Sequence, residues 1–398
     1  LMPKIENIRC VLLSSPYADA DEPEIKECFP NGPKRTIGMI EVTLDNGIRG
    51  LGEGYLAVFA PKVFESIVEL CSPYLLHKEA FNLEQRVSDL CRVCDYWSLQ
   101  GAARHVTSAF EIALADAKAK SSGIPVHQLF GKVQVEAMRM YGSGGCCDQK
   151  DHFIRELEML EGLGINLYKI RAVKEDIRRT AWILEEAGRR DIEIGVDMCQ
   201  NLTDPPQDVK EVVDYVEAVG SLTEKNIVFL EEAIGPANPD GFKALRDCVT
   251  PKICGGEIIT TPKEMIDRIN NNIYDFVQPD ASVIGGIGAV MEVFSAAKRK
   301  GTDVVVHAWG GPVAIMASYH AAFAGGGSLV EYPMLSFPLG DEMLGDTLKI
   351  SGGHLKCPDG PGLGVNLSEN IEKRYPFDET AVYSCKTLEW SKTPETYW

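Results

Sequence analysis

The sequence predicts an α/β protein in which a smaller α+β domain precedes a large barrel of alternating strands and helices. From about Val135 onward, short apolar runs alternate with amphipathic stretches, and the alternation repeats eight times. This is the pattern of consecutive βαβ units, and eight parallel strands close into a (β/α) barrel. The length agrees with this interpretation, because 398 residues exceed a typical single domain.

The first part of the chain is predicted to contain strands followed by helices. A strand is expected over residues 5–13, and a polar loop follows to about residue 35. Two further strands, 36–44 and 48–55, flank Asp45-Asn46-Gly47, a strong hairpin signal. Helices are predicted over residues 61–76, 83–96 and 102–121. Strands followed by helices indicate an α+β domain.

The eight predicted barrel strands are short and apolar. They cover residues 137–141, 166–171, 192–196, 227–230, 252–255, 274–278, 303–306 and 328–330. After Pro333 the chain becomes rich in loops, and we expect it to return to the first domain rather than build a third. The predicted division is therefore residues 1–133 for the α+β domain, 134–333 for the barrel, and 334–398 for the returning segment.

Charge and composition exclude several classes of protein. A formal net charge of −18 argues against nucleic-acid binding, which needs a basic surface. No apolar run approaches the ~20 residues of a membrane span, and no secretory signal is recognised. The twelve cysteines form no regular framework, and Cys91 and Cys94 lack a second pair at zinc-finger spacing. We expect a cytoplasmic protein with reduced cysteines and without nucleic-acid or membrane partners.

Two cations stand at the end of the second barrel strand. Side chains alternate along a strand, so Lys169 and Arg171 point to the same face. Two cations at the end of a mostly buried strand are costly unless anions face them. The alternative is an edge strand whose basic side chains are solvated.

The later strands each end near one acidic residue or histidine. These residues are Asp197, Glu231, Glu257, Asp280, His307 and Glu331, each about one strand–helix unit after the one before. In (β/α) barrels the active site lies at the C-terminal ends of the strands, so these side chains are expected to form a ring.

Three carboxylates in this ring predict a metal site. Asp197, Glu231 and Glu257 follow adjacent strands, and like charges 4 Å apart repel by about 4 kcal/mol at an effective dielectric near 20. Such a cluster must hold a cation or bind protons. Oxygen ligands alone favour a hard ion, so we expect one Mg²⁺ per active site. Three unrelated surface acids would not explain the regular spacing.

Asp280 and His307 follow neighbouring strands and predict an acid–base pair. A carboxylate can hold one imidazole nitrogen and leave the other free for proton transfer. A lone histidine is usually structural, but this one has an acid one strand away and precedes Ala308-Trp309-Gly310-Gly311, a loop that opens a helix.

These residues resemble the enolase superfamily, specifically its mandelate racemase subgroup, over nearly the whole chain. The motifs that carry the resemblance are Ala113-Leu-Ala-Asp116, Gly123-Ile-Pro-Val-His-Gln-Leu-Phe-Gly131, Phe229-Leu-Glu-Glu232, Gly255-Gly-Glu257, Val277-Gln-Pro-Asp280 with Gly285-Gly286, Val306-His307, Leu329-Val-Glu-Tyr332 and Asp359-Gly-Pro-Gly-Leu-Gly364. The resemblance implies a modified (β/α)₇β TIM-type barrel with an α+β capping domain made from both chain ends. Members of this family often form homo-oligomers, which we expect here too.

The resemblance also implies a chemistry. Mg²⁺ on the residues that match Asp197, Glu231 and Glu257 would assist abstraction of a proton α to a carboxylate and stabilise the enediolate. Glu331 would donate a hydrogen bond if it stays protonated, and Lys169 would add positive charge at the substrate carboxylate.

Departures from the family pattern decide which reaction we predict. Where a second lysine commonly acts as a base, this chain has Arg171, whose high pKa makes it a poor base. Cys199 replaces a common Asn, and Ala233 replaces a common Pro. A racemase would lack one of its two bases, whereas a dehydratase needs one. We therefore predict dehydration of an aldonic or aldaric acid to a 2-keto-3-deoxy acid, with His307 as base and acid and Arg171 positioning the substrate.

Substrate contacts are expected from the capping domain and from residues near the strand ends. The loops at 17–34 and 55–62 are candidates because loops on a fixed scaffold usually set specificity. The candidate side chains are Tyr17, Tyr55, Phe59, Trp309 and Cys199. The alternatives are a racemase or epimerase with Lys169 or Arg171 as second base, a cycloisomerase, and a non-catalytic barrel that binds an acidic metabolite.

Overall fold

The computed structural model describes residues 2–17, 34–381 and 398. The predicted specificity loop at 17–34 therefore lies almost entirely outside the described residues. In the described part of the chain, no helix combines the length and the apolar character that crossing a membrane requires.

The capping domain is built on a three-stranded antiparallel sheet of β1 (Ile5–Pro16), β2 (Lys34–Leu44) and β3 (Arg49–Glu53). The predicted hairpin is confirmed, and Gly47 takes the positive φ of 80° that its turn requires. Helices α2 (Leu56–Phe59), α3 (Pro61–Cys71), α4 (Leu83–Cys94) and α5 (Ala102–Ser122) follow. Gly52 lets β3 approach α5, since a Cβ there would lie 1.7 Å from the Ala109 carbonyl oxygen.

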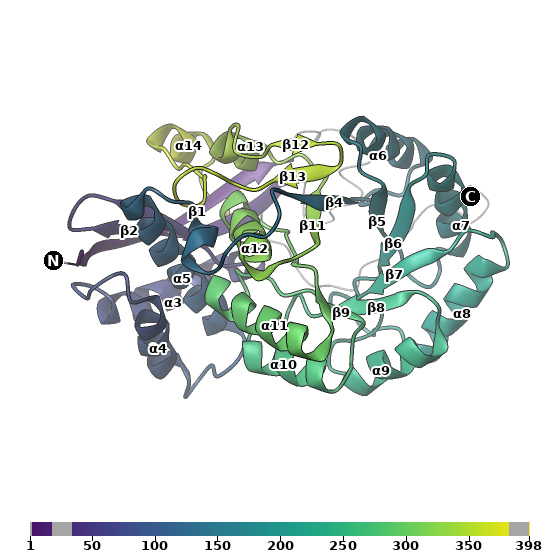
Figure 1. Ribbon diagram of the computed structural model, residues 1–398, viewed down its shortest axis with the longest axis horizontal. Helices are drawn as coiled ribbons and strands as arrows, with labels where there is room; N and C mark the ends of the chain where they lie inside the picture. Colours follow the sequence, from purple (N-terminus) through teal and green to yellow (C-terminus); the bar gives the residue numbers. More distant parts are fainter. Residues whose placement is uncertain (1, 18–33, 382–397) are drawn as a thin grey trace.

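The barrel confirms the predicted (β/α)₇β class. Its parallel strands are β4 (Ala137–Ser143), β5 (Leu167–Arg171), β6 (Glu193–Asp197), β7 (Ile227–Glu231), β8 (Lys252–Gly255), β9 (Phe276–Val277), β10 (Asp303–Val304) and β11 (Leu329–Pro333). The connecting helices are α6 (Lys150–Leu163), α7 (Ile177–Gly188), α8 (Val209–Gly220), α9 (Pro239–Cys248), α10 (Pro262–Asn270), α11 (Ile287–Lys300) and α12 (Pro312–Gly325). Figure 1 shows helices α8 to α11 around the outside of the barrel, with the capping domain beside it.

Strands β9 and β10 are shorter than predicted. The predicted strand at 274–278 runs into Pro279, which has no N–H to donate to a neighbouring strand. Single hydrogen bonds still hold the chain in line, because the Val305 and His307 amides donate to Val277 O and Pro279 O, each at 3.0 Å. The strand ends therefore keep their places although the regular ladder is short.

Side-chain caps fix where several barrel helices begin. Asp208 and Glu211 form a reciprocal capping box at α8, and Thr261 accepts a hydrogen bond from the Glu264 amide at α10. At the other end, α11 stops at Gly301, whose φ of 75° suits a residue without a side chain.

The segment after Pro333 contains structure that was not predicted. Strands β12 (Ile350–Ser351) and β13 (His354–Lys356) form a hairpin that pairs with β4, so they extend the barrel sheet. Helices α13 (Pro338–Leu344) and α14 (Glu369–Arg374) lie close to β1 (Figure 1). The Arg9 guanidinium on β1 pairs with Glu372 at 2.7 Å. The exact domain boundaries stay a prediction.

Buried carboxylates from the capping domain join it to the barrel. Glu53 accepts hydrogen bonds from the Gly311 and Ala314 amides at 2.7 and 2.9 Å, at the start of α12. Glu111 on α5 accepts from Ile287 and Gly288 at the start of α11, each at 2.9 Å. Both carboxylates thus satisfy N–H groups that a helix N-terminus leaves free.

Glu111→Gln is expected to remove part of the pH dependence of stability. Burial raises the pKa of Glu111 to about 7, which its two amide donors only partly offset. An unfolded glutamate titrates near ~4.3, so the folded state binds more protons between those values. This group's contribution to stability is therefore present at pH 4 and is lost as pH rises to 7. Urea denaturation at pH 5 and pH 8 measures it.

Native protein should lose more stability than the Glu111→Gln variant between these two pH values. The control is Glu158→Gln, which changes an exposed glutamate on α6 and should leave the native pH dependence intact. An identical pH dependence in native and Glu111→Gln proteins would contradict the argument.

Candidate active site

The barrel interior is charged at the C-terminal ends of the strands and apolar nearer their N-terminal ends. The apolar layer consists of six buried side chains that contact one another: Tyr141, Leu167, Phe229, Cys254, Phe276 and Val305. Lys169 and Glu231 stand two residues beyond Leu167 and Phe229, so they face the same interior. Parallel pairing sets Arg171 beside Asp197 and Asp197 beside Glu231. The strand ends therefore bring the predicted charged residues together.

Lys169 is a buried cation between two carboxylates. Its side chain is 1% exposed, and its Nζ lies 2.6 Å from Glu231 Oε1 and 2.8 Å from Glu331 Oε1. Burial alone would lower the pKa of Lys169, but Glu231 and Glu331 outweigh it and hold the pKa well above the usual value. The alternative of a solvated edge strand is therefore wrong, and Lys169 is a fixed positive charge.

Arg171 is held by three neighbours. Its guanidinium lies 4.5 Å from the centre of the Trp309 ring, donates to Gly144 O at 2.6 Å, and approaches Asp197 at 4.0 Å. Burial lowers its pKa, and surrounding thiols and carboxylates raise it by more. These contacts agree with the prediction that Arg171 stays positively charged and does not act as a base.

The three predicted metal ligands share one electrostatic neighbourhood. Burial raises the pKa of Asp197, Glu231 and Glu257, and in each case another of the three raises it further. Each also accepts a hydrogen bond: Asp197 from the Cys199 amide at 2.9 Å, Glu257 from Asn201 at 2.7 Å, and Glu231 from Gln278 at 2.6 Å. The cluster is anionic and destabilised by its own charge.

These carboxylates suit a hard divalent cation by their chemistry. In the described residues, no three His, Cys, Asp or Glu side chains are yet close enough together to hold a metal ion. Hydrogen-bond donors occupy these oxygens instead: Lys169 and Gln278 donate to the two oxygens of Glu231, each at 2.6 Å, and Asn201 donates to one oxygen of Glu257. The donor set therefore fits Mg²⁺, whereas the positions form no finished coordination shell.

His307 and Asp280 form the predicted pair. His307 Nδ1 lies 2.6 Å from Asp280 Oδ2, while Asp280 Oδ1 accepts from the Ser282 amide and hydroxyl at 2.7 and 2.6 Å. This arrangement makes Nδ1 the donor and turns Nε2 toward the carboxylate cluster, 3.5 Å from Glu257 Oε2.

The pKa of His307 depends on the cluster beside it. Burial lowers this pKa, but Glu257 and then the hydrogen bond to Asp280 raise it, to about 10 overall. Neutralising the charge of Glu257 would remove the strongest of the raising influences and free Nε2 to accept a proton.

Glu331 differs from its expected state. Burial raises its pKa, but Lys169, His307 and the Ala308 amide, which donates at 2.8 Å, lower it by more, so the net shift is downward. The direction of this shift is opposite to the expectation that Glu331 stays protonated, because two cations face it. It acts as an acceptor that balances Lys169.

The predicted substrate contacts divide into two groups. The Tyr55 ring stands edge-on to His307 at 6.0 Å, and Phe59 packs on Tyr55 at 5.9 Å. Trp309 and Tyr17 lie on the other side, by Arg171 and Arg35. The fifth, Cys199, is buried beside Asp197, with a φ of 48° that an Asn would adopt more readily.

Several residues at the site escaped the sequence analysis. They are Gln278 and Asn201, which donate to the carboxylates, Glu53 and Ser282, which brace the His307 and Asp280 loops, and Arg35, which lies beside Trp309. Gln278 carried a signal, since it stands inside the motif Val277-Gln-Pro-Asp280. Arg35 and Glu53 carried none, because only folding brings the capping domain to the barrel.

Family models match most of the chain. The model described as Enolase C-terminal domain-like covers residues 152–371, and the model described as Mandelate racemase / muconate lactonizing enzyme, N-terminal domain, covers residues 25–131.

Individual proteins are similar over nearly their full length. Arabinonate dehydratase from Saccharolobus solfataricus is 25% identical over 88% of this chain and 91% of that protein. The crystal structure of 3,6-anhydro-D-galactonate cycloisomerase from Zobellia galactanivorans matches with a TM-score of 0.82 and 25% identity, covering 94% of this chain and 100% of that one. L-talarate/galactarate dehydratase from Salmonella typhimurium, solved with Mg and L-lyxarohydroxamate, matches with a TM-score of 0.80 and 22% identity over 94% of each chain.

Proposed function

The chain belongs to the enolase superfamily, in the mandelate racemase and muconate lactonizing enzyme group, and we propose that it is an acid-sugar dehydratase. The proposed reaction is Mg²⁺-dependent loss of water from an aldonic or aldaric acid to give a 2-keto-3-deoxy acid. The observation that carries the proposal is the His307–Asp280 pair. The carboxylate cluster separates this pair from Lys169 and Arg171, which both stay protonated. Once a cation neutralises the charge of Glu257, His307 Nε2 can accept a proton, whereas Lys169 and Arg171 keep theirs.

His307 moves both protons in the proposed reaction. Its Nε2 takes the proton from C2, and the electron pair of that bond passes toward the substrate carboxylate. The C3–oxygen bond then breaks, and the hydroxyl takes the proton from Nε2 and leaves as water. The resulting enol becomes the 2-keto acid. Asp280 holds the imidazole through Nδ1 and stabilises its positive charge while it carries the proton.

Asp197, Glu231 and Glu257 would hold Mg²⁺. When bound, the ion would offset the negative charge that develops on the substrate carboxylate, a contribution worth several kcal/mol. Lys169 adds a second positive charge to the same region, fixed by Glu231 and Glu331. Arg171 orients the substrate through its planar donors. Similarity to dehydratases supports this assignment.

The direct test is a screen of aldonic and aldaric acids for 2-keto products with and without Mg²⁺. The proposal predicts a keto acid from at least one of them, and none after chelation of the metal. A panel that yields no keto acid under either condition contradicts it and favours a non-catalytic acid-binding barrel.

Arg171→Lys is expected to create a second proton-transfer group opposite His307. A lysine beside Trp309 can lose a proton more readily than a guanidinium. The variant should show C2 deuterium exchange in D₂O with inversion, while native enzyme shows none, and proton NMR of the recovered substrate measures this. The absence of new exchange in a variant that still dehydrates would contradict the one-base assignment.

A cycloisomerase is the second candidate. The chain is 25% identical to the 3,6-anhydro-D-galactonate cycloisomerase, and the match covers the whole of the cycloisomerase chain. The proton abstraction by His307 would be the same, and the leaving group would differ. Mass spectrometry separates the two, since dehydration removes the mass of one water and cycloisomerisation removes none. A racemase would likewise keep the mass but invert C2.

The remaining expectations stay predictions. They are the homo-oligomeric state, the cytoplasmic location and the division at residues 133/134 and 333/334. Size-exclusion chromatography with light scattering measures the first of these.

A further inference from the structure

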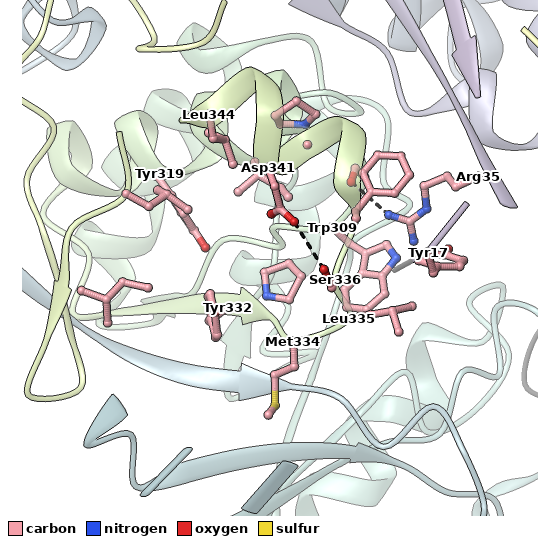
Figure 2. Close-up of a pocket in the computed structure, with 18 of the residues that line it drawn as sticks. Tyr17, Arg35, Trp309, Tyr319, Tyr332, Met334, Leu335, Ser336, Asp341 and Leu344 are labelled. Carbon is pink, nitrogen blue, oxygen red and sulfur yellow. Dashed lines mark hydrogen bonds between the residues drawn. The ribbon is translucent and has the colours of Figure 1, made fainter. Parts of the chain in front are cut away.

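Arg35, on strand β2 of the capping domain, lies among three aromatic rings. Its guanidinium carbon is 5.6 Å from the centre of the Tyr17 ring, 5.2 Å from Trp309 and 5.7 Å from Phe337. Figure 2 shows Arg35 beside Trp309 and Tyr17, with its hydrogen bond drawn as a dashed line. The rings bring the guanidinium next to the loop that follows His307.

In the part of the chain that the structure describes, this guanidinium has no carboxylate partner. Within residues 2–17, 34–381 and 398, no carboxylate lies at ion-pair distance from Arg35. Its five N–H groups have two neutral partners there, Gly310 O at 2.9 Å and the Tyr17 hydroxyl. Glu53 is the carboxylate whose charge acts on Arg35, but its oxygens already accept from Gly311 and Ala314. A half-buried cation without a counter-ion is costly, so the site favours an incoming anion.

Arg35 and Arg171 lie close to each other around one aromatic side chain. Both guanidinium groups lie against the Trp309 ring, at 5.2 and 4.5 Å. Burial raises the pKa of Cys146 to about 11, and the charges of both Arg171 and Arg35 act to lower it. The charges of Arg35 and Arg171 thus act on the same thiol, in agreement with their shared contact with Trp309, although Arg35 belongs to the capping domain.

There is room for a ligand group beside Arg35. A cavity of about 480 Å³ is lined by Arg35, Tyr17 and Trp309 and also by Ser336 and Asp341. Figure 2 shows Ser336 and Asp341 joined by a dashed line, on the far side of Trp309 from Tyr17. Arg35 is the cation of this cavity, and its planar N–H groups suit two-point binding of a carboxylate or phosphate.

We propose that Arg35 binds a second anionic group at the far end of the acid sugar, so that the preferred substrate carries two anions. The first carboxylate binds at Lys169, Arg171 and the metal ligands, and the second anion is a terminal carboxylate or phosphate. This inference rests on the proposed dehydratase function. It also fits the charge of the chain, because a net charge of −18 repels a dianion unless local cations attract it at short range.

The test compares matched ligands that differ only at the terminal carbon: six-carbon aldonic acids, the aldaric acids of the same configuration, and the 6-phosphates of the aldonic acids. Native enzyme should show at least a 10-fold higher kcat/KM for one dianionic set. Arg35→Gln should lower the ratio of dianion to aldonic kcat/KM at least 10-fold, to about one, and Arg35→Lys by less. Lys34→Gln, which breaks an exposed ion pair with Asp378 on the same strand, is the control and should keep the native ratio.

A second measurement removes turnover from the comparison. In a His307→Asn background, calorimetric titration with the same ligands should show tighter binding of the dianions, and adding Arg35→Gln should abolish the difference. The phosphate and carboxylate arms identify which anion is bound.

The outcomes separate this inference from the proposed function. Aldonic acids dehydrated as well as the dianions, or equal losses for all ligands in Arg35→Gln, would overturn the role of Arg35 and leave the dehydratase standing. No keto product and no C2 exchange with any ligand in native enzyme would overturn both.

Discussion

Replacing His307 with asparagine is expected to lower kcat by about 10³–10⁴-fold, because the proposed reaction has one group that can take the C2 proton. Asparagine can still accept and donate hydrogen bonds, so Asp280 need not lose its partner. Lys169 and Arg171 cannot substitute, since carboxylates and an aromatic ring keep both charged. Steady-state assays of 2-keto product measure the loss.

The structural effect of this change should be small and separable. Metal affinity, measured calorimetrically, should survive, because His307 is not among the three proposed ligands. The matched control is His77→Asn, which changes an exposed histidine at a φ of 66° that asparagine also adopts, and it should keep native activity. Turnover in His307→Asn within about tenfold of native would refute the base assignment.

Lys169→Met is expected to destabilise the protein by about 3–5 kcal/mol, besides removing activity. Methionine fills a similar volume, but the variant leaves Glu231 and Glu331 buried without the cation that faces them. Two uncompensated carboxylates at 0% side-chain exposure must then bind protons or take up water. Urea denaturation measures the loss.

The comparison is with an exposed lysine on the same barrel. Lys263 pairs with Asp267 on α10, and its side chain is 84% exposed. Lys263→Met should leave the stability close to that of native protein, since surface ion pairs contribute little. Equal losses in the two variants would show that the Lys169 ion pairs do not stabilise the fold.

The fold was predictable because its signals are local and repeated. Short apolar strands that end in Asp197, Glu231 or His307 recur at the spacing of one βα unit, and such periodicity survives without tertiary information. The hairpin of β12 and β13 was missed because strands of two and three residues show no alternation. It is stabilised by pairing with β4, which is remote in sequence.

The sequence predicted which residues gather at the site, but it predicted their protonation states and contacts less well. Strand alternation put Lys169 in the barrel interior, but its bridge between two carboxylates depends on how the folded barrel brings β5, β7 and β11 together. That bridge lowers the pKa of Glu331 and reverses its expected protonation. The role proposed for Arg35 could not be predicted from the sequence. It depends on the contact with Trp309 and on the lack of a carboxylate around Arg35 in the described residues, and both follow only from the fold.

Proton NMR of a reaction in D₂O with Mg²⁺ tests the central claim most directly. If His307 is the single base of a dehydratase, an acid sugar should yield a 2-keto-3-deoxy acid with deuterium at C3. The substrate recovered at partial conversion should keep its configuration at C2. Substrate that is recovered as a deuterated C2 epimer, with no keto acid formed, would contradict the account.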